Sequence, residues 1–360
     1  LPEIDGLRFI AISTVVLLHV SVALAAYGNQ SLSDEWQDPL FLLEKTFNFG
    51  VQLFFVLSGF ILALPFAQAD LLGGKVIKLK TYYLRRLLRI EPPYLIALSS
   101  IFLLRLLFEH ASFKVYFPHF LASVFYLHNQ IFDSHSWIMG QAWSLEVEAQ
   151  FYITAPLLAS IYKIKGLKTR RILLLILMLI SAEHSPLLTY PGRDLHLLTF
   201  AHFFLCGLLL ADFFLLDWQK PSKFPELWDL CGLAAATSLI AILFPPFRPS
   251  VLPAFLVLLI YAAAFRGKLI RKFVRSPWIV TIGGMCYTIY LYHQTIITGL
   301  SRATFHLVLS KIFWVNLVLQ SVLLIPFILI SSAILFLLFE KPFMYRDWLQ
   351  TLSSIKLKAN

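Results

Sequence analysis

The chain has 360 residues, of which 59% are hydrophobic and only 14% are charged, and its mean hydropathy is +0.76. Soluble domains carry about 25% charged residues, so this composition excludes a soluble globular protein and indicates an integral membrane protein. The formal net charge is +10, but the basic residues gather in short loops and offer no soluble basic face, so we expect no nucleic-acid partner.

The first apolar segment, residues 6–27, contains polar groups that a lipid-facing helix excludes. Asp5, Arg8 and His19 stand within the run IDGLRFIAISTVVLLHV. At about 100° per residue, the spacing from Arg8 to His19 returns to nearly the same helix face. A charged side chain at the bilayer centre costs roughly 2.5–3.5 kcal/mol, so this stripe must face protein or water. We interpret it as the start of an active site. The segment lacks a small-residue cleavage site, so no cleavable signal peptide is expected.

Apolar stretches recur along the chain and predict an all-α integral membrane protein with about ten transmembrane helices in one bundle. Eight or twelve helices would also fit, because a missed pair of spans preserves the pattern. The stretch 117–132 is apolar but is interrupted by Pro118 and polar residues, so we interpret it as a re-entrant or interfacial helix. The predicted spans are 6–27, 47–66, 92–108, 140–162, 172–188, 197–216, 227–245, 250–265, 279–300 and 312–339.

Basic residues cluster after every second predicted span, whereas the opposite loops are poor in lysine and arginine. The positive-inside rule then places both termini in the cytoplasm. We expect residues 1–346 to form the transmembrane domain and residues 347–360 to form a cytoplasmic C-terminal tail. The basic clusters lie within 75–89, 163–171, 220–223, 266–275 and 341–358.

An arginine cluster precedes the third span in the segment TYYLRRLLRIEPPY, residues 81–94. Arg86 and Arg89 are three positions apart, and Arg85 and Arg89 are four apart, so each pair shares a helix face. The two consecutive prolines that follow are expected to stop or kink the helix. Guanidinium pairs bind phosphates through forked hydrogen bonds. Juxtamembrane arginines also anchor helices at anionic lipid, and the spacing alone does not separate these two interpretations.

The fourth span begins with QAWSLEVEAQFY, residues 141–152. Ser144, Glu148 and Tyr152 lie near one helical line, and Glu146 points roughly the other way. Two carboxylates in a helix that enters the membrane are costly unless each has a partner. Glu148 is therefore either a catalytic group or a buried structural carboxylate, and the spacing favours neither.

The second and ninth spans add weaker candidates. Ser58 and Gly59 interrupt the second span, where small residues allow a backbone or a ligand to approach closely. No neighbouring base in the sequence supports Ser58 as a nucleophile. His293 lies in the ninth span beside Tyr287 and Tyr290. A core histidine satisfied by hydrogen bonds is the commoner explanation for such a residue taken alone.

The histidines and cysteines predict no metal site. The three cysteines are dispersed within apolar runs, so neither a disulfide nor a metal framework follows from them. Near the predicted outer face, the spacing of Glu183, His184, His196 and His202 matches no ligand motif.

Five motifs together resemble the acyltransferase-3 family of membrane-bound O-acyltransferases, in the family's order and across nearly the whole chain. The resemblance implies a ten-helix core, in the bacterial cytoplasmic membrane, that moves an acyl group from acyl-coenzyme A to a hydroxyl of a glycan or glycolipid. Acetyl is the default acyl group, and no permanently bound cofactor is expected. Some members append an extracellular esterase-like domain, which we do not expect in this chain. The motifs are IDGLR…H (4–19), FFVLSGFIL (54–62), RRLLRIEPPY (85–94), WSLEVEAQFY (143–152) and YTIYLYHQ (287–294).

The resemblance also implies roles for single residues. The family's functional arginine and histidine of the first helix match Arg8 and His19, and its Arg-x-x-Arg pair matches Arg86 and Arg89. Its WSL-x-VE glutamate matches Glu148; Ala149 stands where members often carry a second acidic residue. The resulting candidates are His19, Arg8, Glu148 and Asp5 for catalysis, Arg86, Arg89, Arg85 and Ser58 for acyl-coenzyme A, and Trp143, Ser144, Tyr152 and His293 for the acceptor.

The mechanism that these assignments imply begins with the anionic coenzyme entering where Arg86 and Arg89 lie. Arg8 lies near the pantetheine path or the acyl carbonyl, and His19 is about 16 Å further along the helix at 1.5 Å per residue. An imidazole with an ordinary pKa of about 6.5 suits a general base for the acceptor hydroxyl at neutral pH. We favour direct transfer over an acyl-histidine intermediate. The alternative function is a transporter or flippase of a lipid-linked sugar, which needs no donor site. Neither the acceptor, the acyl length nor the oligomeric state follows from the sequence.

Overall fold

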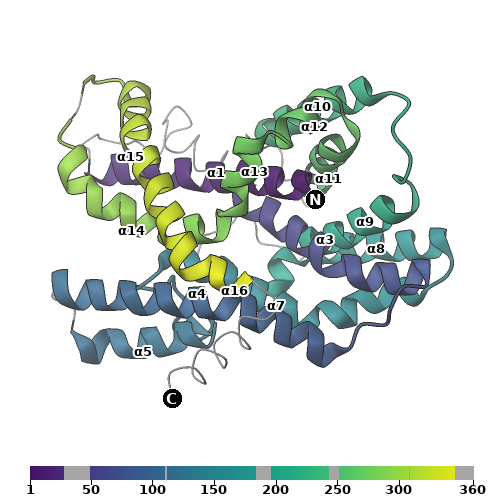
Figure 1. Cartoon of the computed structure of the whole chain (residues 1–360), viewed down its shortest axis with the longest axis horizontal. Coiled ribbons are helices and arrows are strands. Elements are labelled where there is room, and N and C mark those ends of the chain that lie inside the picture. Colours follow the sequence, from purple (N-terminus) through teal and green to yellow (C-terminus); the bar gives the residue numbers. More distant parts are fainter. Residues whose placement is uncertain (28–48, 110–111, 184–195, 243–250, 308, 345–360) are drawn as a thin grey trace, which may run out of the picture.

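The computed structural model describes residues 1–27, 49–109, 112–183, 196–242, 251–307 and 309–344. These residues form helices and no strand, which confirms the predicted all-α class. The long N-terminal helix α1 (Pro2–Tyr27) crosses the middle of the molecule, and the C-terminal helices, yellow in Figure 1, run over it toward α4 (Leu79–Phe108). The predicted C-terminal tail, residues 347–360, lies outside the described residues.

Every predicted span coincides with helical structure. Among the described residues, five helices are long and apolar enough to cross a membrane, and the remaining predicted spans coincide with shorter helices. The five are α1, α3 (Phe49–Leu72), α4, α9 (Leu197–Leu216) and the continuous run α15 (Phe313–Leu335), η3 (Phe336–Glu340) and α16 (Lys341–Met344). The shorter ones are η1 (Gly140–Ala142), α7 (Trp143–Leu158) and η2 (Ala159–Lys163), then α8 (Leu167–Glu183), α10 (Pro225–Ala241), α11 (Leu252–Arg266), α13 (Pro277–Gly284) and α14 (Cys286–Thr304). The short helix α12 (Leu269–Val274) lies between two predicted spans.

Two segments differ in detail from the sequence-based expectation. The paired prolines do not end their helix, because α4 continues through Pro92 and Pro93 as a single helix of 30 residues. The arginine cluster and the third span therefore share one helix. The stretch 117–132 contains two helices, α5 (Phe113–Val124) and α6 (His128–Phe132), separated by a turn in which Tyr126 has a φ of 56°. Whether it re-enters a membrane stays a prediction.

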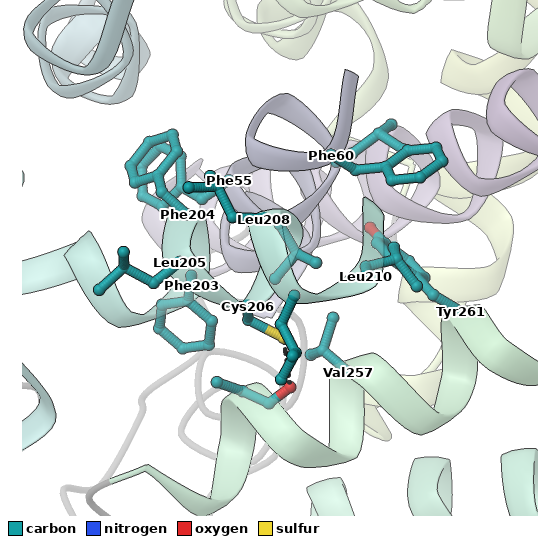
Figure 2. Close-up of a cluster of buried hydrophobic side chains, with 14 of the residues drawn as sticks. Phe55, Phe60, Phe203, Phe204, Leu205, Cys206, Leu208, Leu210, Val257 and Tyr261 are labelled. Atoms are coloured by element: carbon teal, nitrogen blue, oxygen red, sulfur yellow. Dashed lines mark hydrogen bonds between the residues drawn. The ribbon is translucent and has the colours of Figure 1, made fainter. Parts of the chain in front are cut away.

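Helices α3 and α9 approach each other so closely that glycine is required at two facing positions. A Cβ atom on Gly59 would lie 2.3 Å from the carbonyl oxygen of Phe204, and one on Gly207 would lie 2.3 Å from that of Val56. Around this contact the aromatic and aliphatic side chains form the buried cluster shown in Figure 2. The close backbone approach predicted at Ser58-Gly59 is therefore present, and its partner is α9.

We expect Gly207→Ala to destabilise the protein, because the new methyl group meets backbone atoms that cannot rotate away. Overpacking of this kind costs about 1–3 kcal/mol. The midpoint of thermal unfolding of the purified protein in detergent should therefore fall. The control is Gly299→Ala on α14, where a Cβ atom meets nothing within 4 Å. Equal midpoints for the two variants would contradict the close contact.

Candidate active site

A cavity of about 130 Å³ lies where α1, α3, α4, α7, α14 and the end of the last long helix meet. The side chains that line it come from separate motifs and are far apart in the sequence. Seven of the predicted site residues line it. The polar lining side chains are Arg8, Ser58, Arg86, Arg89, Ser144, Glu148, Tyr152, Tyr287, Tyr290 and Glu340.

Glu148 organises the polar groups of this cavity. The carboxylate accepts hydrogen bonds from the hydroxyls of Ser58 and Tyr152, and the positive charges of Arg8 and Arg86 act on it. Ser58 therefore has an acidic partner that the sequence did not reveal, since the two residues are 90 positions apart. The carboxylate compensates the positive charge of the two arginines and orients the two hydroxyls that donate to it.

The second acidic residue of this motif, Glu146, points elsewhere, as the helical spacing predicted. It is buried and accepts hydrogen bonds from the backbone amide of Asn129, at 2.9 Å, and from that of His128. These amides belong to the first turn of α6. Glu146 thus fixes α6 against α7, and only Glu148 faces the cavity.

Arg8 is held in place by its own helix and by the helices packed on it. Its Nη1 atom lies 2.7 Å from the Oδ1 atom of Asp5. Asp5, a predicted catalytic residue, does not line the cavity; its carboxylate pairs with Arg8. At Gly283, which belongs to α13, a Cβ atom would lie 1.8 Å from the carbonyl oxygen of Asp5. This contact fixes the beginning of α1 and with it the position of the guanidinium.

The two arginines of the Arg-x-x-Arg pair, Arg86 and Arg89, line the cavity from α4. Arg85 is exposed and lies outside the lining. Two tyrosines near the beginning of α4 form hydrogen bonds to α7. The Tyr82 hydroxyl donates to the carbonyl of Tyr152 at 3.1 Å, and the Tyr83 hydroxyl donates to that of Ile153 at 2.9 Å. The arginines are therefore placed by contacts that no local sequence pattern encodes.

His19 and His293 form a pair that stands beside the cavity but does not line it. Their ring centroids are 4.8 Å apart and the rings are nearly perpendicular. The Nδ1 atom of His19 lies 2.8 Å from the carbonyl of Val15, and that of His293 lies 2.9 Å from the carbonyl of Tyr290. A carbonyl only accepts, so in each neutral ring Nδ1 carries the proton and Nε2 keeps a free lone pair. His293 is fully buried, and its Nε2 has no partner among the described residues.

Tyr290 connects this histidine pair to the cavity. Its ring lies 6.2 Å from that of His293, and its hydroxyl donates to the carbonyl of Gln141. The Ser144 hydroxyl, 2.9 Å from the Tyr290 oxygen, completes the hydrogen bonds of this side chain. Tyr290 and its partners thus form the wall between the cavity and His293.

The sequence reasoning missed one acidic residue of the cavity. Glu340, at the end of η3, lines the cavity opposite Arg89 and accepts hydrogen bonds from the backbone amide and hydroxyl of Thr288. The signal was weak, because Glu340 stands at the edge of the last apolar run directly before Lys341. Trp143, predicted to bind the acceptor, packs against Phe55 and Phe200 outside the lining.

The fold and the cavity define a multi-pass helical membrane protein whose internal site presents three guanidinium groups and two carboxylates. Residues 1–339 match the sequence model of a protein family that is described as an acyltransferase domain. The chain therefore belongs to the acyltransferase-3 family, as the five motifs predicted.

Curated relatives match most of this chain. The peptidoglycan O-acetyltransferase OatA of Listeria monocytogenes is 27% identical in an alignment of 330 positions that covers 82% of this chain and 49% of that protein. The O-acetyltransferase OatA of Staphylococcus aureus is 24% identical in an alignment of 331 positions that covers 82% of this chain and 50% of that protein. The chain thus spans about half the length of the curated relatives that it matches. No solved structure is significantly similar to it.

Proposed function

We propose that this protein transfers an acyl group, in the first instance acetyl, from acyl-coenzyme A to a hydroxyl of a glycan or glycolipid acceptor. Membership of the acyltransferase family and the names of the relatives support O-acetylation of a glycan. The observation that carries the proposal is the convergence of Arg8, Arg86 and Arg89 on one cavity, with a histidine pair behind its wall.

In this proposal the donor binds through its phosphates. Arg86 and Arg89 hold the phosphates with charge-assisted hydrogen bonds, which are stronger than neutral ones. The rest of the cavity takes the pantetheine arm. Arg8, fixed by Asp5, then lies along the path of the arm or at the acyl carbonyl.

The chemical step is direct transfer with His19 as general base. The Nε2 atom of His19 takes the proton of the acceptor hydroxyl, the oxygen attacks the thioester carbonyl, and the carbon–sulfur bond breaks. The coenzyme leaves as a thiolate, which takes the proton from the His19 imidazolium and so restores the base. Because His19 does not line the cavity, this step requires a movement that brings the acyl group and the His19 ring together. Positioned proton transfer of this kind contributes about 10²–10⁴-fold to rate.

The test of the donor site is protection by ligand. Acetyl-coenzyme A should raise the unfolding midpoint of the purified full chain, because a ligand at 100 times its Kd adds about 2.7 kcal/mol to stability. Acetyl-dephospho-coenzyme A, which lacks only one phosphate, is the matched control and should protect less. Membranes that contain the protein should also move radiolabel from acetyl-coenzyme A to glycan. Absence of both protection and transfer would favour the transporter alternative.

A further inference from the structure

We propose that a second cavity, beside the histidine pair and at the other end of α4, holds the sugar ring that carries the acceptor hydroxyl; this inference rests on the proposed acyl transfer. The cavity has a volume of about 230 Å³ and lies between α4, the segment 138–141 and α14. Its side chains with recognition chemistry are Arg105, Phe108, Gln141, Gln294, Thr295 and Thr298.

The lining suits a neutral ligand rich in hydroxyls. The only charged side chains of this lining are Arg105 and Glu109, whose Nη1 and Oε2 atoms are 2.7 Å apart, so their charges cancel. Amides and threonine hydroxyls both donate and accept hydrogen bonds, as sugar hydroxyls do. Phe108, 72% exposed at the rim, offers an apolar ring face beside them. A phosphate or a carboxylate would find no net positive charge here.

One buried atom of this cavity lacks a partner. The Oε1 atom of Gln294 is buried and accepts no hydrogen bond from the described residues. Leaving such an acceptor unsatisfied costs about 1–3 kcal/mol. By contrast, the amide of Gln141 is engaged, since its Nε2 atom donates to the carbonyl of Leu291 at 3.1 Å. Gln294 is therefore a buried group of the lining whose oxygen can accept a hydrogen bond from a sugar hydroxyl.

The second cavity adjoins the first across the wall already described. Gln141 lines the second cavity, and its carbonyl accepts the hydrogen bond of Tyr290, which lines the first. On α14, His293 directly precedes Gln294 and follows Tyr290 by one helical turn. The proposal therefore requires that a hydroxyl held by Gln294 reach the histidine pair from the second cavity, while a thioester reaches it from the first.

The two cavities open at opposite ends of one helix. Arg89 and Arg105 on α4 are separated by about 24 Å at 1.5 Å per residue. A donor held by Arg89 and an acceptor held near Arg105 therefore do not compete for one entrance. This separation suits a reaction in which the coenzyme and the glycan arrive from opposite faces of the membrane, since the positive-inside prediction places the Arg89 end of α4 on the cytoplasmic side.

The experiment uses the purified full chain, radiolabelled acetyl-coenzyme A and chitotetraose, a soluble oligomer of N-acetylglucosamine. This probe is chosen because one relative is named a peptidoglycan O-acetyltransferase. Gln294→Leu and Thr298→Val should each raise the KM for chitotetraose at least tenfold, and each should leave the KM for acetyl-coenzyme A and the protection that it gives unchanged. The control is Thr237→Val, an exposed threonine on α10 outside both cavities.

The outcomes separate this inference from the proposed function. Loss of protection by acetyl-coenzyme A in the unaltered protein would refute the donor site, whatever the variants do. Protection with acetyl-coenzyme A but neither transfer to chitotetraose nor protection by it would overturn the sugar assignment. Transfer with an unchanged KM in both variants would overturn the location of the acceptor.

Discussion

Replacement of His19 by alanine should abolish acyl transfer, with a loss of at least about 100-fold in kcat and up to about 10⁴-fold. The reason is that His19 presents an unprotonated Nε2 atom, because its Nδ1 proton is held by the carbonyl of Val15. His19 does not line the cavity that holds the arginines. Acetyl-coenzyme A should therefore still raise the unfolding midpoint of His19→Ala. The measurements are initial rates of label transfer and thermal unfolding with and without the donor.

A second readout separates a base from a structural histidine. Adding imidazole to His19→Ala should restore part of the rate, since the vacated space lies next to His293 and admits a small ring. Imidazole should leave the unaltered protein unaffected. If His19→Ala turned over at the rate of the unaltered protein, His19 would not be the general base. A variant that fails to bind the donor as well would show that His19 supports the fold.

Much of the fold could be predicted from the sequence because a membrane imposes a local rule. Each span must be apolar over its whole length, so hydropathy alone places the helices. The same rule marks function, since a polar residue within an apolar run needs a partner. It singled out Arg8, His19 and Glu148 as candidates from the sequence alone, and their neighbours in space followed only from the structure.

Long-range pairings are what the sequence could not predict. Asp212 is an isolated charge in the apolar run of α9, and its two partners stand on α8: Arg170 at 2.5 Å and Arg171 at 2.7 Å. Nothing local distinguishes this buried structural cluster from the cluster at Glu148. The second cavity was not predicted for a related reason. Uncharged residues such as Gln294 and Thr298 do not stand out in an apolar run as a charged residue does.

The pairing of His293 with His19 also could not be predicted from the sequence around either residue. His293 considered alone was expected to be a core histidine, and one of its nitrogens does bond to its own helix. The free Nε2 atom and the neighbouring ring of His19 become visible only when α1 packs on α14. A residue that is structural in its own helix can thus complete a site that another helix begins.

Arg86→Ala and Arg89→Ala should each raise the KM for acetyl-coenzyme A by about 10–150-fold, since a hydrogen bond to a charged group contributes about 1.5–3 kcal/mol. The value of kcat should change little, because both arginines lie on the cavity side of Tyr290, away from the histidine pair. Arg86→Lys should recover only part of the affinity, because an ammonium group lacks the planar fork that matches a phosphate. Steady-state rates at varied donor concentration give both constants.

The matched control for these variants is Lys80→Ala, which removes one positive charge from the same end of α4 at an exposed position outside the cavity. If general attraction of the anionic coenzyme to a basic surface explained the effect, all three alanine variants would shift KM alike, and added salt would erase the difference. Phosphate binding inside the site predicts instead that Lys80→Ala keeps its KM. It also predicts that the loss in Arg86→Ala shrinks with acetyl-dephospho-coenzyme A, because a donor with one phosphate fewer has less binding energy to lose. A fall in kcat with an unchanged KM would show that Arg86 and Arg89 act in the chemical step and not in donor binding.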